Sequence, residues 1–140
     1  MIDTRQYRVG NFIQSDGDMF AIDHINSEFI GAGALTVYVP NADHDEIDIP
    51  LTPELLEKAG FRLVDETMGS GIEGIKGPYY AHDALLLWSN GSEPKNAYLV
   101  YYGSGEFGKY FAARGRWINV LHDLQNVYFG WSGKELTIKL

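Results

Sequence analysis

The sequence contains no cysteine and little positive charge. Without cysteine, the chain forms no disulfide, no thiolate metal site and no cysteine nucleophile. Its 11 Lys and Arg residues are outnumbered by 19 Asp and Glu residues, which gives a formal net charge of -8. The missing thiols fit a reducing compartment, so we expect a cytoplasmic protein.

Long apolar runs are also missing. No stretch approaches the roughly 18 apolar residues that cross a membrane. The N-terminal segment MIDTRQYRVGNF lacks the basic segment and apolar core of an export signal. We therefore expect a soluble protein with no membrane partner.

The negative charge is concentrated in the first half of the chain. Residues 1–66 hold 4 Lys or Arg and 13 Asp or Glu, a net charge of -9, whereas residues 67–140 hold 7 and 6, a net charge of +1. Nucleic-acid backbones require clustered basic residues, so direct nucleic-acid binding is disfavoured. Another protein is the expected partner, and a basic one would be attracted to the first half.

The length of 140 residues, with 45% apolar and 14% aromatic residues, predicts one folded domain over residues 1–140. Two subdomains, residues 1–66 and 79–140, are the alternative within that domain. The glycine-rich segment 67–78 would join them. Because each half is marginal in size alone, a shared core is favoured.

Short strands dominate the first half of the chain. Two apolar-rich runs flank Asp16-Gly17, a pair typical of a tight hairpin turn. Further strands are predicted at 35–39 and 46–50. Together they indicate a bent antiparallel sheet, of which an SH3-like partial barrel is one form.

The segment IPLTPELLEKAGF predicts a short helix. Thr52 can cap it, Pro53 fits its first position, and Gly60 fits the left-handed position after its end. A strand is predicted to follow at 61–65.

The second half predicts an antiparallel sheet covered by one helix. Strands are expected at 79–89, 96–102 and 109–115, a helix at 116–129, and a last strand at 135–140. The expected fold class is therefore α+β.

The stretch GSGEFGKY, residues 103–110, matches parts of two nucleotide-binding patterns. A Walker A loop needs Ser or Thr after Lys109 and a helix behind it, but Tyr110 follows and the next residues alternate like a strand. A kinase cannot be completed in the short remainder of the chain after Tyr110. We predict a hairpin turn, with anion binding as the rival; its candidate residues are Gly103, Gly105, Gly108 and Lys109.

No catalytic or metal-ligating set is complete. The histidines, His24, His44, His82 and His122, have no paired metal-ligand spacing. The acidic run over residues 43–48 lacks the spacing of a calcium loop and is typical of a solvated strand face. We expect no metal, no cofactor and no catalytic residue, which favours a non-enzymatic protein.

Apolar residues recur at helical spacing near the end of the chain, as in a helix that packs on a core. A polar stripe runs along its flank. Such a stripe is usually solvated or bonds to nearby backbone, and its rival is a recognition surface. That candidate interaction surface consists of Asn119, His122, Gln125 and Asn126.

Three segments carry a resemblance: RVGN (8–11), IPLTPELLEKAGF and HDLQNVYFGWSGKEL. The sequence resembles uncharacterised small proteins of Bacteroides-group bacteria and their phages and prophages. These show R-x-G-N, P-L-T-x-E-x-L-x-x-x-G-F and H-x-L-Q-N-x-Y-F-x-L-T-G-x-E-L in the same order. Trp131 and Ser132 depart from the last pattern. The resemblance implies a phage or mobile-element context and points to no particular activity.

These observations favour a non-enzymatic, protein-binding accessory factor. The alternative is a small-ligand or nucleotide binder that uses the loop from Gly103 to Lys109 and the nearby aromatic residues Tyr80, Trp88 and Tyr102. An enzyme with a dispersed site is a third interpretation.

Overall fold

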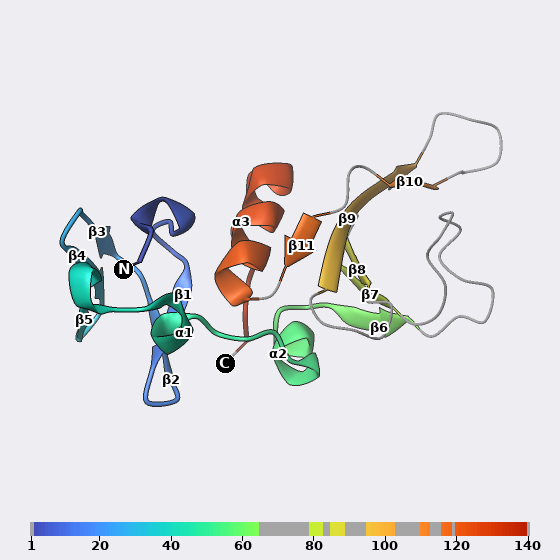
Figure 1. Cartoon of the computed structure of the whole chain (residues 1–140). Coiled ribbons are helices and arrows are strands. Elements are labelled where there is room, and N and C mark those ends of the chain that lie inside the picture. Colours follow the sequence, from blue (N-terminus) through green and yellow to red (C-terminus); the bar gives the residue numbers. More distant parts are fainter. Residues whose placement is uncertain are drawn as a thin grey trace. The chain divides into compact units, whose positions relative to one another are not determined.

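A computed structural model describes residues 2–64, 79–82, 85–88, 95–102, 110–112, 116–118 and 120–139 (Figure 1). The chain divides into two compact units. Unit 1 comprises Met1–Leu51 and Val120–Leu136, and unit 2 comprises Thr52–Asn119 and Thr137–Leu140. The main segment of unit 2 is thus inserted in the sequence of unit 1, and its last four residues follow that sequence. This division differs from the predicted halves, and the predicted linker 67–78, like the rest of residues 65–78, lies outside the described residues.

Unit 1 contains a hairpin of strands β1 (Phe12–Ser15) and β2 (Asp18–Ala21). Ser15 pairs with Asp18, and the two turn residues both have positive φ, 51° at Asp16 and 84° at Gly17. This is the conformation that two-residue hairpin loops favour, and it confirms the turn predicted there.

A three-stranded antiparallel sheet follows, in the order β3 (His24–Ile25), β4 (Phe29–Ala32) and β5 (Leu35–Tyr38). Alternate residues point to opposite faces. Ile30, Ala32 and Val37 face the core of unit 1, while Phe29 and Tyr38 lie on the outer face. The strand expected at 35–39 is confirmed, and the strands of the described residues form no closed barrel.

The strand predicted at 46–50 is wrong. A short helix α1 (His44–Ile47) follows the 3-10 turn η2 (Val39–Asn41). Acidic residues in the first turn favour the positive end of a helix dipole, and Asp45 and Glu46 hold those positions. Beyond α1 the chain is extended, and Pro50 forms an isolated antiparallel bridge with Val120.

The last helix, α3 (Leu121–Ser132), belongs to unit 1. It was expected over 116–129 as the cover of the C-terminal sheet, but residues 116–118 form strand β11 (Arg116–Ile118). Residues 116–118 pair with residues 95–97, and this pairing makes them a strand instead of the first turn of the helix. The helix continues through Gly130 and ends at Ser132, and Gly133 caps it with a left-handed φ of 72°. The last strand, predicted over 135–140, is wrong over its described residues 135–139, which form no strand.

Unit 2 begins with the predicted capped helix. In α2 (Pro53–Lys58) the Leu55 backbone N–H donates to Thr52 Oγ1 at 3.1 Å. Gly60 follows with a φ of 89°. Strand β6 (Arg62–Val64) confirms the strand expected at 61–65.

A six-stranded antiparallel sheet completes unit 2. Its order is β10 (Tyr110–Ala112), β9 (Lys95–Tyr102), β8 (Leu85–Trp88), β7 (Tyr79–His82) and β6, with β11 also paired to β9. The single strand predicted over 79–89 is wrong, because β7 and β8 form a hairpin in which His82 pairs with Leu85. The α+β class is confirmed. Among the described residues, no helix has the length and apolarity needed to cross a membrane.

Candidate functional site

The candidate anion-binding loop, residues 103–109, lies outside the described residues. Its flanks are described: β9 and β10 pair antiparallel, with Tyr102 opposite Tyr110. The predicted hairpin strands are therefore confirmed. A strand, rather than the helix of a Walker A motif, follows Lys109. Anion binding by the loop itself stays a prediction.

Two of the four residues of the candidate recognition stripe on the last helix are buried in unit 1. The side chains of His122 and Gln125 are each only 1% exposed. Asn126 is half-buried and hydrogen-bonded, and Asn119 lies outside the described residues. A polar position that is buried and satisfied has the same sequence pattern as a solvated one, so the prediction could not separate the two.

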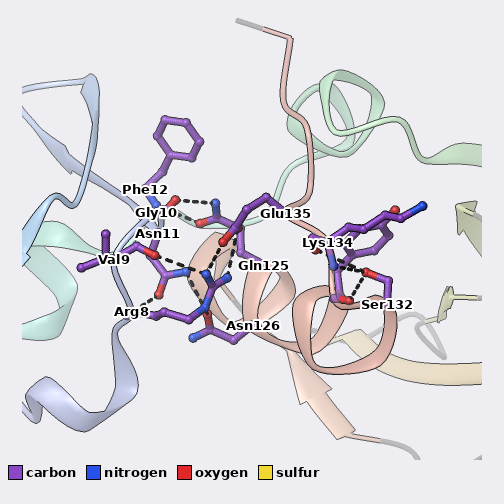
Figure 2. A network of polar contacts seen from close by, with 11 residues as sticks. Arg8, Val9, Gly10, Asn11, Phe12, Gln125, Asn126, Ser132, Lys134 and Glu135 are labelled. Atoms are coloured by element: carbon purple, nitrogen blue, oxygen red, sulfur yellow. Dashed lines mark hydrogen bonds and ion pairs between the residues drawn. The ribbon is translucent and has the colours of Figure 1, made fainter.

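Asn126 instead joins the RVGN segment to α3 (Figure 2). Its Oδ1 accepts hydrogen bonds from Asn11 Nδ2 at 2.8 Å and from Arg8 Nε at 3.2 Å. Its Nδ2 donates to the Gln6 carbonyl at 3.1 Å. Asn11 is fully buried, and its Oδ1 accepts the Arg8 backbone N–H at 2.8 Å. The three side chains thus hold one another in a fixed arrangement.

Gln125 pairs with the backbone of the same segment. Its Oε1 accepts the Phe12 N–H at 2.8 Å, and its Nε2 donates to the Gly10 carbonyl at 3.1 Å (Figure 2). The two bonds hold the partly buried backbone on either side of Asn11 against α3. Gln125 therefore serves the fold of unit 1.

Arg8 reaches the residues after α3. Its guanidinium forms a two-pronged ion pair with Glu135, in which Nη2 donates to Oε2 at 3.1 Å. The guanidinium carbon also lies 4.2 Å from the centroid of the Phe129 ring. The first and last segments of the resemblance therefore meet in one network, whose role in unit 1 is to fasten α3 to the N-terminal strands.

A second cluster gathers acid and base groups from three segments of unit 1. The Tyr7 hydroxyl donates to Asp48 Oδ1 and lies 2.8 Å from His44 Nδ1. The Tyr7 ring stacks on the His44 ring at 5.7 Å and tilts against the His122 ring at 4.4 Å. Tyr7 and His122 are buried, whereas His44 and Asp48 are partly exposed.

The hydrogen bonds define which groups donate and which accept in this cluster. The Asp3 backbone N–H donates to His44 Nε2 at 3.2 Å, so this nitrogen carries no proton. In the neutral His44 ring, Nδ1 then carries the proton and donates it to the Tyr7 oxygen in a hydrogen bond. The Tyr7 hydroxyl in turn donates to Asp48. The chain of donors therefore ends on the carboxylate.

His122 is the least satisfied member of the cluster. Its Nε2 lies 3.2 Å from Asp48 Oδ1 and its Nδ1 lies 3.7 Å from Asp123 Oδ1. Within the described part of the chain, neither ring nitrogen has a hydrogen-bond partner. A proton on either nitrogen would face a carboxylate.

Burial, followed by the hydrogen bond to Asp48 and the charges of Asp48 and Asp123, raises the pKa of Tyr7 well above its usual range.

This cluster positions α1. His44 and Asp48 lie at the two ends of α1 and turn toward Tyr7, while Asp45 and Glu46 are exposed to solvent. Among the described residues, no group of three or more His, Asp or Glu side chains is placed to hold a metal ion. Tyr7 and Asp48 are far apart in the sequence, and no local sequence signal predicts their contact.

No protein-family model matches the chain, and neither curated proteins nor solved structures give a match. The functional inference therefore rests on the residues themselves, in particular those of unit 1.

Proposed function

We propose that the protein is a non-enzymatic accessory factor that binds a basic protein through the acidic surface of unit 1. The distribution of charge carries this proposal. Unit 1 holds 3 Lys or Arg and 11 Asp or Glu, a net charge of -8, whereas unit 2 holds 8 of each. The whole net charge of the chain thus belongs to one unit. Such a field attracts a basic partner and speeds its association.

The basic residues of unit 1 do little to screen this charge. Both arginines are engaged within the unit, Arg5 with Asp3 at 3.0 Å and Arg8 with Glu135. Asp45 and Glu46 on α1 point to solvent, as do Asp16 and Asp18 at the tip of the β1–β2 hairpin. A partner therefore meets carboxylates on two separate elements.

The resemblance to proteins of Bacteroides-group phages and prophages supports a mobile-element context for this binding. The cysteine-free sequence is consistent with action in the bacterial cytoplasm. The proposal thus includes a bacterial host protein as the partner.

Affinity capture from a Bacteroides-group lysate tests the proposal. The full chain should retain a stoichiometric basic protein at about 50 mM salt and release it at about 500 mM, because salt screens exposed charges. Asp45→Asn/Glu46→Gln should weaken capture. Asp16→Asn/Asp18→Asn removes the same charge from the hairpin tip and shows which element matters. Capture that is insensitive to salt and to both variants would reject the proposal, as would the absence of any partner.

A further inference from the structure

The outer face of the three-stranded sheet exposes an aromatic pair. Phe29 of β4 lies opposite Tyr38 of β5, with ring centroids 5.3 Å apart. The two side chains remain 37% and 46% exposed. In the described part of the chain no cation lies over this pair, whereas the exposed Phe129 ring already carries the Arg8 guanidinium.

The strand surface beside this pair carries a carboxylate held by a hydrogen bond. Gly31 lies two residues from Phe29 on the same face, about 7 Å along the strand. A Cβ atom on Gly31 would lie 3.3 Å from Asp23 Oδ1 and 3.5 Å from the His24 Cβ, so the carboxylate and His24 lie beside the backbone at Gly31. Asp23 Oδ2 accepts the Gly33 N–H at 3.0 Å, which holds the carboxylate in place.

We propose that this face, formed by Asp23, Phe29, Gly31 and Tyr38, binds an arginine side chain of an extended basic segment in the partner protein. The inference rests on the proposed function and names the contact surface. A guanidinium plane can lie on an aromatic face while its N–H groups donate to a carboxylate. The absence of a side chain at Gly31 leaves room for the Asp23 carboxylate beside β4. The net charge of -8 on unit 1 complements the basic segment.

The geometry favours arginine over lysine. Guanidinium is planar and weakly hydrated, so it stacks on rings better than the compact ammonium group of lysine. Contacts of this kind at exposed sites amount to about 2- to 5-fold in affinity. Charge attraction alone gives no such difference between two peptides of equal charge.

Titration of the full chain with hexa-arginine and hexa-lysine peptides tests this inference, with amide chemical shifts recorded for each. Hexa-arginine should bind about 2- to 5-fold more tightly, and its shifts should centre on residues 23–38. Phe29→Thr/Tyr38→Thr should abolish this preference and leave hexa-lysine binding unchanged, because the variant has the same charge. Val9→Thr, at an exposed apolar residue elsewhere in unit 1, should behave like the unmodified chain. Tyr38→Thr alone provides the same comparison if the double variant does not fold.

The outcomes separate the two proposals. If the preference persists without the aromatic pair, this inference is wrong and the acidic-surface proposal stands. If neither peptide binds at low salt, the proposed function fails and this inference fails with it. A chain that sediments as a dimer, and as a monomer after Tyr38→Thr, would assign the aromatic pair to self-association and overturn the inference.

Discussion

The Tyr7 side chain shows how one buried group can connect distant segments of unit 1. Its hydroxyl contacts both His44 and Asp48, and its ring lies against His122 of α3. Hydrogen bonds to a charged acceptor contribute more than neutral ones, about 1.5–3 kcal/mol. The position of α1 and its exposed carboxylates therefore depends on this residue.

Replacing Tyr7 by Phe should lower the free energy of unfolding by about 1.5–3 kcal/mol, because the Asp48 carboxylate loses its buried donor. Urea unfolding at neutral pH measures the change. Tyr38→Phe removes an exposed hydroxyl and should change the stability by no more than about 0.5 kcal/mol. Equal effects of the two substitutions would contradict the role assigned to Tyr7.

The raised pKa of Tyr7 predicts a loss of stability at alkaline pH. In the unfolded chain tyrosine releases its proton near pH 10, whereas the folded chain retains the proton on Tyr7 to higher pH. The contribution of Tyr7 is therefore complete below about pH 10. It falls as the pH rises further, by up to about 1.4 kcal/mol per pH unit. Unfolding free energies measured across this range should show a shallower decline for Tyr7→Phe, and an unchanged decline would refute the prediction.

Much of this residue-level arrangement could not be read from the sequence. His122 and Gln125 were assigned to a polar stripe, because helical spacing identifies residues that share a face without revealing what covers that face. Gln125 bonds to Gly10 and to Phe12 at the start of β1, and the His122 ring lies beside Asp48, just after α1. Contacts between segments so distant in the sequence depend on topology, which the local pattern does not encode.

At the scale of elements, local chemistry was a sound guide where the determinants are local. The Asp16-Gly17 turn and the Thr52 cap formed as predicted, because positive φ angles and a capping oxygen act within a few residues. The prediction failed at α1 and at β11. The apolar spacing of such short segments fits both the helical and the strand period. Their neighbours in space therefore decide between helix and strand.

A pair of glycine substitutions tests the loop that binds α3. Gly10 has a φ of 97°, and an added Cβ would lie 3.3 Å from Glu135 Oε1. Gly10→Ala should therefore destabilise the protein by about 1–2 kcal/mol. Gly130 lies inside α3 with open space around its Cβ position, so Gly130→Ala should stabilise it by about 0.5–1 kcal/mol. Thermal unfolding should shift in opposite directions, and shifts of the same sign would contradict this assignment.

At the scale of the molecule, the sequence of unit 1 is interrupted by that of unit 2. The two segments of unit 1 meet where Pro50 pairs with Val120 and where the Leu121 N–H donates to the Ile49 carbonyl at 2.8 Å. Both polar clusters also join these segments. The second segment therefore supplies contacts that the first cannot make alone.

A chain in which a linker of about four residues replaces residues 52–119 should fold as unit 1. Residues facing each other across a bridge lie about 5 Å apart, so a tight turn can join Leu51 to Val120. The two segments retained, Met1–Leu51 and Val120–Leu136, together reach the size at which small domains fold alone. Dispersed amide resonances that match those of the full chain would show folding. Residues 1–51 alone should stay unfolded, because Asn11 and Phe12 lose their hydrogen-bond partners on α3. If that fragment folds, or if the linked chain does not, unit 1 is not the independent unit inferred here.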